Sequence, residues 1–259
     1  MSIFDLSGKV AVVTGSTRGI GKAIAMQMAL HGARVVISSR KAESCEAVVA
    51  EINAAGGTAM AHPAHVGHKE ELKGLVDATI ARWGRIDVLV CNAAANPHFG
   101  PSISITDAAL EKVIQTNLYS NIWLCNLTLP GMAERKDGAV IIISSVAGLY
   151  GTNLLGAYAI SKAADMQLAR NLAVEWGPHN IRVNCIAPGV IRTHFAKALW
   201  ADPQRIASRQ RRLALRRIGE PDDVAGIAVM LASRAGDFIT GQTVVVDGGG
   251  LISGGEPLM

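Results

Sequence analysis

The sequence predicts an α/β fold, a single-domain doubly wound parallel sheet of about seven strands with helices on both faces. Three observations support this expectation. Apolar, β-branched runs alternate with segments of helical periodicity along the whole chain. A glycine-rich turn separates the first run from the first helical segment. No internal repeat or linker divides the 259 residues, so one domain, 1–259, is expected.

The predicted strands are mostly continuous apolar runs, as expected for strands that are buried on both faces. These runs cover residues 10–13, 34–38, 58–61, 86–91, 139–143, 181–186 and 243–246. Helices are expected at residues 22–31, 42–55, 69–83 and 158–173, after Thr106-Asp107, and from the Pro221 region onward. Residues 194–218 are less regular, and we expect a mobile substrate lid there.

Residues 14–21, Thr-Gly-Ser-Thr-Arg-Gly-Ile-Gly, lie between the first predicted strand and the first helix. In this setting the three glycines allow a tight turn, a close approach of backbone to pyrophosphate, and close packing of helix on strand. Free N–H groups at the helix N-terminus favour phosphate. The dinucleotide-binding residues expected here are Gly15, Thr17, Arg18, Gly19, Ile20 and Gly21.

The end of the second predicted strand indicates which dinucleotide binds. Sites for NAD usually carry an acidic residue about 20 positions beyond the glycine motif, to bind the ribose hydroxyls. This chain has Ser38-Ser39-Arg40-Lys41 instead. Arg40 can pair with a 2′-phosphate, with Arg18 and Lys41 nearby, so NADP(H) is expected in preference to NAD(H). The alternative is that Arg40 and Lys41 only begin a solvated helix.

Tyr158 and Lys162 are four residues apart in a helical pattern, so their side chains are expected on one helix face. A free phenol has a pKa near ~10, and a nearby ammonium favours the phenolate. Ser145 follows an apolar run, which would place its hydroxyl at the carboxyl edge of the sheet. Together the three groups can pass a proton to or from a carbonyl oxygen. Alone, the Tyr-Lys pair is more typical of an exposed helix surface, and it is Ser145 together with the glycine-rich turn that favours the functional interpretation.

Charge and hydropathy argue against several classes of partner. The formal net charge is +4 and the basic residues are dispersed, so no nucleic-acid partner is expected. The basic cluster at residues 205–217 is interpreted as a solvated helix face near an anionic cofactor or partner. No apolar run reaches the ~18 residues of a membrane span, and residues 1–6 lack the features of a signal peptide.

Neither the cysteines nor the histidines show the spacing of a metal site. The four cysteines form no C-x-x-C pair, which favours reduced packing residues in a cytosolic protein. His62, His65 and His68 recur at three-residue spacing, but Pro63 and Gly67 interrupt them. We therefore expect no bound metal.

Together these residues resemble the short-chain dehydrogenase/reductase family over essentially the whole chain. The resemblance implies a Rossmann-type fold and an NADP(H)-dependent enzyme that moves hydride between nicotinamide and a ketone, aldehyde or secondary alcohol. The matching motifs are Thr14-Gly-x-x-x-Gly-Ile-Gly21, Asn92-Ala-Ala94, Asn117, Ser145, Tyr158-x-x-x-Lys162 and Pro188-Gly189 with Thr193.

The resemblance also implies a role for each matching residue. Tyr158 would be the general acid or base, and Ser145 would hold the substrate oxygen. Lys162 would lower the tyrosine pKa and bind the nicotinamide ribose, while Asn117 would support a water-mediated proton relay. The resemblance also implies a set of residues that contact the cofactor. Besides Tyr158 and Lys162, these are Ser39, Arg40, Lys41, His65, Val66, Asn92, Pro188, Gly189, Ile191 and Thr193.

Four stretches point to a subgroup of the family: Ser38-Ser-Arg-Lys41, His65-Val-Gly67, Asn92-Ala-Ala-Ala-Asn-Pro97 with Phe99-Gly100, and Arg217-Ile-Gly-Glu-Pro221. In these stretches the chain is most similar to NADPH-dependent carbonyl and retinal reductases of the member 4 type. His65 departs from the usual Asp, which alters the adenine contact, and Ala94 departs from Gly, which adds a methyl group near the cofactor. Relatives are commonly homotetramers, so a homotetramer is expected. Residues 255–259 lack the peroxisomal ending of the animal relatives, which points to the cytoplasm.

The substrate is expected to be a small, hydrophobic carbonyl compound or alcohol. One alternative is a 3-oxoacyl-(acyl carrier protein) reductase, in which Arg205, Arg209, Arg211 and Arg212 would receive the acidic carrier. A further alternative is a non-catalytic nucleotide-binding scaffold. The side chains expected around the substrate are Asn96, His98, Phe99, Tyr150, Leu155 and Trp200, with Leu149, Leu154 and Phe195 beside them.

Overall fold

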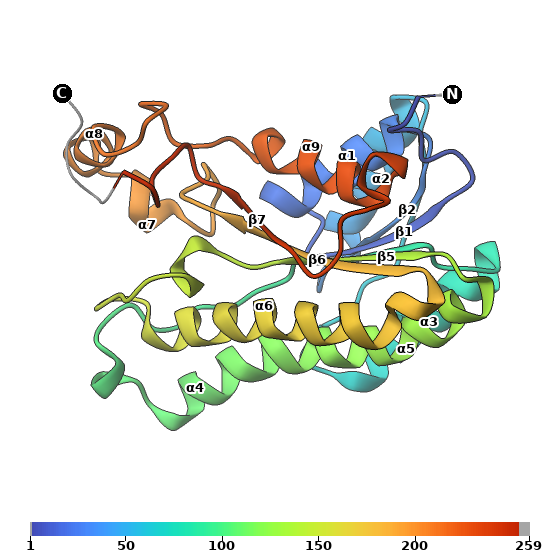
Figure 1. Ribbon diagram of the computed structural model, residues 1–259, viewed down its shortest axis with the longest axis horizontal. Coiled ribbons are helices and arrows are strands. Elements are labelled where there is room, and N and C mark those ends of the chain that lie inside the picture. The colour runs from blue at the N-terminus through green and yellow to red at the C-terminus, as the bar shows by residue number, and fades with distance from the viewer. Residues whose placement is uncertain (1, 254–259) are drawn as a thin grey trace.

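The computed structural model describes residues 2–253 and contains a seven-stranded sheet between two helical layers (Figure 1). The strand order is β3-β2-β1-β4-β5-β6-β7, and all neighbouring strands are parallel. This confirms the predicted fold. The strands are β1 (Val10–Thr14), β2 (Arg34–Ser38), β3 (Thr58–Ala61), β4 (Val88–Cys91), β5 (Gly138–Ile143), β6 (Ile181–Pro188) and β7 (Thr243–Val246).

The two helical layers cover opposite faces of the sheet (Figure 1). One layer consists of α1 (Gly19–Leu30), α2 (Ala42–Ala54) and α9 (Pro221–Ala232). The other consists of α3 (Lys69–Trp83), α4 (Asp107–Ile114), α5 (Ser120–Arg135) and α6 (Gly156–Trp176). Short helical segments are η1 (Ser102–Ser104), η2 (Gln115–Tyr119), η3 (Val146–Gly148), η4 (Gly177–His179), α7 (Lys197–Trp200), α8 (Pro203–Gln210) and η5 (Arg234–Gly236).

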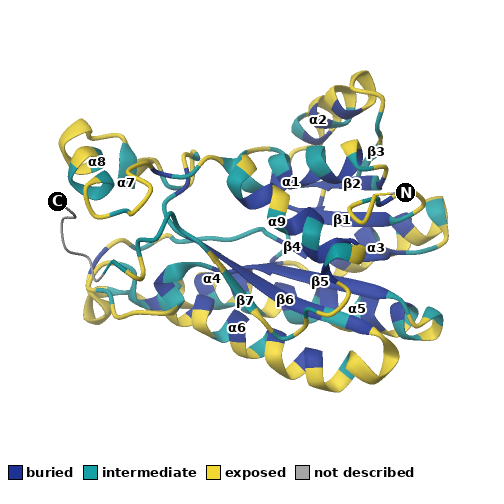
Figure 2. Cartoon of the chain, turned by 45° about the horizontal axis from the view of Figure 1, so that its top comes forward, coloured by how far each residue is buried: buried dark blue, intermediate teal, exposed yellow. Residues whose placement is uncertain are grey.

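Each face of the sheet has its own hydrophobic core. Along β1, Ala11 and Val13 belong to the core under α1, α2 and α9, whereas Val12 belongs to the core above α3, α5 and α6. Successive side chains of a strand point to opposite faces, so a sheet that is covered on both faces needs apolar residues at every position. Figure 2 shows the buried strands between helices whose outer surfaces are exposed.

Three segments differ in detail from the sequence-based expectation. Helix α1 begins at Gly19, so two glycines of the turn belong to its first turn. The helix expected after Thr106 is interrupted by η2, a π-helical turn that contains Asn117. Residues 194–218 include α7 and α8, which stand at one end of the molecule (Figure 1). Their role as a mobile lid stays a prediction.

Within residues 2–253, no helix combines the length and the apolar character of a membrane span. The four cysteines are free and buried. The C-terminal ending on which the expectation about peroxisomes depended, residues 255–259, lies outside the described residues.

Candidate active site

The turn between β1 and α1 accepts only glycine at its key positions. Gly15 and Gly19 have φ values of +65° and +56°, a region that other residues rarely adopt. A Cβ atom on Gly21 would lie 2.4 Å from Nδ2 of Asn92 and 2.5 Å from the carbonyl oxygen of Gly15. The backbone can therefore fold tightly back on itself at the start of α1, as a phosphate-binding turn requires.

Asn92, at the end of the neighbouring strand β4, fastens this turn. Its Nδ2 atom donates to the carbonyl oxygen of Thr14 at 2.8 Å and to that of Gly15 at 3.3 Å. Its backbone N–H donates to Oγ1 of Thr14 at 3.0 Å, and the N–H of Ala93 donates to the same oxygen at 3.1 Å. These bonds fix the shape of the glycine turn, and the contribution of Asn92 to a cofactor cleft stays a prediction.

The side chains around the turn fit an anionic dinucleotide. No side chain caps the N-terminus of α1, and its first turn carries no acidic residue, so its N–H groups and dipole are available to a phosphate. Arg18, Arg40 and Lys41 are exposed. Within residues 2–253, none of these three side chains forms a hydrogen bond or an ion pair with the protein, so all three can meet a phosphate. Ser39 lies beside them, directly after β2.

His65 follows β3 and is held in place by its neighbours. Its N–H donates to Oε2 of Glu71 at 2.6 Å, and its Nδ1 accepts from the N–H of Gly67 at 3.1 Å. Its ring stacks on that of His68 with the centroids 4.4 Å apart. Burial lowers the pKa of His65, so the ring is neutral at pH 7. In the described part of the chain, no three His, Cys, Asp or Glu side chains form a group that could hold a metal ion.

Tyr158 and Lys162 lie one turn apart on α6, with Nζ of Lys162 5.8 Å from the centre of the phenol ring. Ser145 follows β5 and begins η3, where its Oγ accepts from the N–H of Ala147 at 3.1 Å. Burial raises the pKa of the Tyr158 phenol, and Lys162 and the Ser145 hydroxyl lower it by less. The three predicted groups therefore meet at the carboxyl edge of the sheet, where the phenol is protonated at neutral pH.

Ser144 joins the strand to the helix that carries the tyrosine. Its Oγ donates to the carbonyl oxygen of Lys162 at 2.7 Å. A Cβ atom on Gly148 would lie 2.7 Å from the backbone nitrogen of Ala163, so η3 touches α6 directly. The position of Ser145 relative to Tyr158 is thereby determined by backbone contacts.

The amide of Asn117 is fully buried and is bonded within the chain. Its Nδ2 donates to the carbonyl oxygen of Ala95 at 3.0 Å and to Oγ of Ser161 at 3.0 Å, and its Oδ1 accepts from the N–H of Ala95 at 2.8 Å. Both amide hydrogens are thus engaged, and they fasten the loop after β4 to α6. The role of Asn117 in supporting a water-mediated proton relay stays a prediction.

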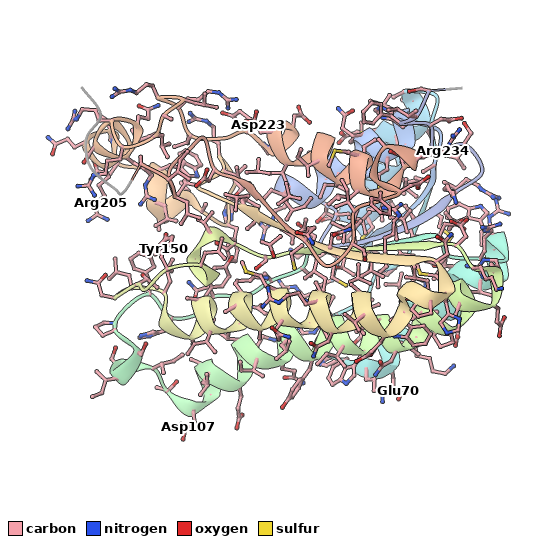
Figure 3. All side chains as sticks on the ribbon, in the orientation of Figure 1. Glu70, Asp107, Tyr150, Arg205, Asp223 and Arg234 are labelled. Atoms are coloured by element: carbon pink, nitrogen blue, oxygen red, sulfur yellow. The ribbon has the colours of Figure 1, made fainter. Side chains whose placement is uncertain are left out.

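Two further segments carry the residues that were expected to surround the substrate. Gly100 bridges Leu155, and its N–H donates to the carbonyl oxygen of Leu154 at 2.9 Å, which joins the loop after β4 to the start of α6. Phe99 and Tyr150 are half exposed nearby. Figure 3 shows Tyr150 at the end of the molecule where α7 and α8 stand, below Arg205.

The other candidates differ in how they are engaged. Trp200 donates through Nε1 to the carbonyl oxygen of Thr193 at 2.9 Å, so it anchors the segment after β6. His98 contacts the carbonyl oxygen of Pro101 through Nε2 at 3.1 Å, a contact within its own loop. Asn96 is half buried after β4. Phe195 lies with its ring centre 6.1 Å from that of Tyr158.

The sequence analysis missed a buried carboxylate that pairs with Lys162, Asp165, and a buried amide that bonds to this carboxylate, Asn121. Asp165 accepts from Nζ of Lys162 at 2.9 Å through Oδ2, and from Nδ2 of Asn121 at 2.9 Å through Oδ1. Asp165 is three residues after Lys162, and Asn121 is four after Asn117. Helical spacing from the predicted residues would have found both.

Similarity to known proteins agrees with this geometry. A family model described as enoyl-(acyl carrier protein) reductase matches residues 15–250. Dehydrogenase/reductase SDR family member 4 of Sus scrofa is 43% identical over 244 residues, which are 94% of this chain and 88% of that protein. The human protein of the same name is 42% identical, with the same coverage.

Solved structures with the same architecture include dehydrogenases. A 7 alpha-hydroxysteroid dehydrogenase complexed with NADH and 7-oxo glycochenodeoxycholic acid has a TM-score of 0.91 and 37% identity, over 95% of this chain and 96% of that one. A gluconate 5-dehydrogenase from Burkholderia cenocepacia in complex with NADP and tartrate has a TM-score of 0.92 and 30% identity, over 96% and 97%. Because the likeness extends over nearly the whole chain, this protein belongs to the short-chain dehydrogenase/reductase (SDR) family of oxidoreductases, which use nicotinamide cofactors.

Proposed function

We propose that the protein is an NADP(H)-dependent oxidoreductase that transfers hydride between nicotinamide and a ketone, an aldehyde or a secondary alcohol. The observation that carries the proposal is the meeting of Tyr158, Lys162 and Ser145 at the sheet edge that also bears the glycine turn. Open parallel sheets bind ligands at this edge. A phenol, an ammonium and a hydroxyl together suit proton transfer to a carbonyl oxygen.

The cofactor, when bound, supplies or accepts the hydride, and the protein manages the proton. In reduction, Tyr158 donates its phenolic proton to the substrate oxygen as negative charge develops there. The Ser145 hydroxyl donates a hydrogen bond to the same oxygen and stabilises that charge. The ammonium of Lys162 favours the phenolate that remains on Tyr158. In oxidation the same groups act in reverse, with Tyr158 as the base.

Preference for NADP(H) is supported by charge. Arg18, Arg40 and Lys41 are exposed cations without a partner in residues 2–253, close to where a 2′-phosphate would lie. Residues 39–41, directly after β2, include no carboxylate that would repel this phosphate or bind a ribose diol. Charge-assisted contacts between guanidinium and phosphate are strong and bidentate, so Arg40 has the largest expected effect.

A hydrophobic substrate is supported by the side chains near Tyr158. Phe195 lies beside the phenol, and Phe99 and Tyr150 expose apolar surface at the same end of the molecule. One structural relative is complexed with a steroid ketone, 7-oxo glycochenodeoxycholic acid. An apolar ketone or aldehyde of some bulk is therefore the substrate class that we propose.

The test compares turnover of an aromatic ketone or diketone with NADPH and with NADH, using Tyr158→Phe as the control. NADPH preference, together with loss of turnover in the variant, is the expected result. NADH preference would overturn the Arg40 argument. Full activity of the phenylalanine variant would overturn the mechanism, and cofactor binding without turnover across a broad carbonyl panel would favour a nucleotide-binding scaffold.

A second candidate function, reduction of a 3-oxoacyl group on an acyl carrier protein, is favoured by the basic surface around α8. Arg205, Arg211 and Arg212 are exposed there, and an acidic carrier would be attracted to such a surface. The discriminating measurement is the ratio of kcat/KM for a carrier-bound and a free 3-oxo substrate. If the protein strongly prefers the carrier-bound form, this form replaces the free ketone as the proposed substrate.

We also propose a homotetramer in the cytoplasm. Ile160 and Val174 are exposed apolar residues on α6, and Tyr119 is half exposed beside α5, so these helices offer apolar surface to other subunits. The four free, buried cysteines are typical of a reducing compartment. Light scattering after size exclusion measures the subunit number, and a monomer would contradict the proposed assembly.

A further inference from the structure

A buried carboxylate stands directly behind the ammonium of Lys162. Asp165 follows Lys162 by three residues on α6, and both side chains are almost completely inaccessible to solvent. The ammonium of Lys162 donates to Oδ2 of Asp165 at 2.9 Å and to the carbonyl oxygen of Ile143, at the end of β5, at 2.8 Å. Two of its three hydrogens are thus engaged away from Tyr158, and one remains for the reacting groups.

The second oxygen of Asp165 connects this ion pair to the neighbouring helix, which lies alongside α6 (Figure 1). Oδ1 accepts from Nδ2 of Asn121 at 2.9 Å, and the same nitrogen donates to the carbonyl oxygen of Asn117 at 2.7 Å. A continuous series of hydrogen bonds therefore joins the π-turn η2, through Asn121 and Asp165, to Lys162. Every polar atom of Asp165 is satisfied, which a buried carboxylate requires.

We propose that Asp165 is a positioning residue for proton transfer: its ion pair holds the Lys162 ammonium beneath Tyr158 and offsets part of the charge that this ammonium presents to the phenol. This inference rests on the proposed function, because it assigns the proton to Tyr158. The Coulomb attraction of an ammonium for a phenolate is weaker when a carboxylate lies on its other side. Proton loss from Tyr158 then gives the buried cluster a net negative charge, which is unfavourable.

The directions of the pKa values agree with this arrangement. Burial alone lowers the pKa of Lys162, but Asp165 and Tyr158 raise it by more, so the lysine stays charged. Burial raises the pKa of Tyr158 above its ordinary value, Lys162 and Ser145 lower it by less, and Asp165 raises it further. The expected consequence is a phenol that keeps its proton through the neutral range, as a general acid for carbonyl reduction must.

The other ionisable groups around the ion pair of Lys162 and Asp165 are buried thiols and, farther away, the guanidinium of Arg170. Cys185 on β6 contacts the carbonyl oxygen of Asp165 through Sγ at 3.4 Å, and burial raises the pKa of its thiol. Cys91 on β4 lies beside Cys125 on α5, and this contact and burial raise the pKa of Cys91. Arg170, farther along α6, lowers the pKa of the Cys185 thiol by less than burial raises it. Asp165 is therefore the nearest negative charge to Lys162.

The test uses Asp165→Asn, which keeps the shape and an acceptor oxygen but removes the charge. Loss of the first proton then converts a buried net positive charge into a neutral phenolate-ammonium pair, which is favourable in a low dielectric. In the pH profile of alcohol-oxidation activity, the limb that rises with pH reports the loss of the Tyr158 proton. We expect this limb to move to lower pH by at least about one unit. An unchanged limb, or a limb that moves to higher pH, would overturn the proposal.

Asp87→Asn is the matched control. Asp87 is equally buried, pairs with Arg85 and accepts from the N–H of Val10 at 2.8 Å, at the opposite edge of the sheet from Tyr158. A purely structural effect of losing a buried carboxylate would appear in both variants as a lower melting temperature. Only Asp165→Asn is expected to move the pH profile, and an equal movement in both variants would also overturn the proposal.

A second measurement needs no turnover, and its result for the natural chain can be interpreted even if Asp165→Asn does not fold. The phenolate absorbance of the cofactor-free protein is titrated, and the titration of Tyr158→Phe is subtracted to isolate Tyr158. We expect the Tyr158 phenolate to appear in the natural chain at a higher pH than that of a free phenol, and at a lower pH in Asp165→Asn than in the natural chain if that variant folds. A midpoint in the natural chain at or below that of a free phenol, near ~10, would overturn the inference. Absence of carbonyl turnover would instead overturn the proposed function and leave this titration interpretable.

Discussion

Gly19 and Thr193 face each other so closely that a Cβ atom on Gly19 would lie 3.1 Å from Cγ2 of Thr193. The contact joins the glycine turn after β1 to the segment after β6, two segments that the sequence separates widely. It closes one side of the proposed cofactor site. Thr193 also accepts from Nε1 of Trp200 through its carbonyl oxygen, so the contact continues into α7.

Gly19→Ala is expected to weaken NADPH binding and to destabilise the protein. The positive φ of Gly19 costs an alanine about 1–2 kcal/mol, and the added methyl group presses on Thr193. Chemical denaturation and NADPH titration measure the two effects. Thr193→Ser in the same chain removes the methyl contact and should restore part of the loss.

Gly226→Ala is the control for this substitution. Gly226 lies within α9, and a Cβ atom there would meet nothing within 4 Å. Alanine should therefore stabilise the helix by about 1 kcal/mol. Equal effects of the two glycine substitutions would contradict the explanation given for Gly19.

Tyr158→Phe is expected to lower kcat by about 10²–10⁴-fold, the usual contribution of a positioned acid-base group. The Kd for NADPH should change little, because phenylalanine keeps the ring beside Phe195. Steady-state kinetics and fluorescence titration of NADPH separate the two quantities. A variant that loses NADPH binding in proportion to activity would contradict the assignment of Tyr158 to proton transfer.

Arg40→Ala is expected to raise KM for NADPH about 10-fold to 100-fold and to leave KM for NADH unchanged, because it removes a charge-assisted contact worth about 1.5–3 kcal/mol. Arg82→Ala is the control, since Arg82 is an exposed cation in the last turn of α3 and its removal changes the net charge equally. An equal loss for NADH, or an equal effect of Arg82→Ala, would show that Arg40 does not select the 2′-phosphate.

Phe195→Ala is expected to raise KM for bulky apolar ketones several-fold and to affect a small ketone less. The half-exposed ring lies beside Tyr158 and would lose apolar contact with substrate worth about 1 kcal/mol, part of the value for a fully buried side chain. Phe238→Ala removes a fully exposed ring after η5 and is the control. The same increase in KM for large and small ketones would show that Phe195 does not contact the variable part of the substrate.

Much of the fold was predictable because its signals are local. Both faces of the sheet are covered, so most strands are apolar at successive positions, and these apolar runs can be read directly from the sequence. The turn at Gly15 and Gly19 was predictable for the same reason, since a positive φ is a property of the residue and its immediate neighbours. The four-residue spacing of Tyr158 and Lys162 likewise needs only a helix.

Local signals could not show which segments meet. The bonds from Asn92 to Thr14 join residues 78 positions apart, and they exist because the strand order places β4 beside β1. The ion pair of Asp165 with Lys162 lies within one helix, yet only the packing of α5, β5 and β6 around it makes it buried.

The sequence by itself therefore determined the type of fold, the glycine turn and the candidate proton-transfer set, because backbone conformation and helical spacing are local properties. The tertiary structure alone decided the contact of Gly19 with Thr193, the place of Phe195 beside Tyr158 and the burial of Asp165. Long-range contacts and desolvation depend on the order of the strands and on how the helices cover them. These are properties of the whole folded chain.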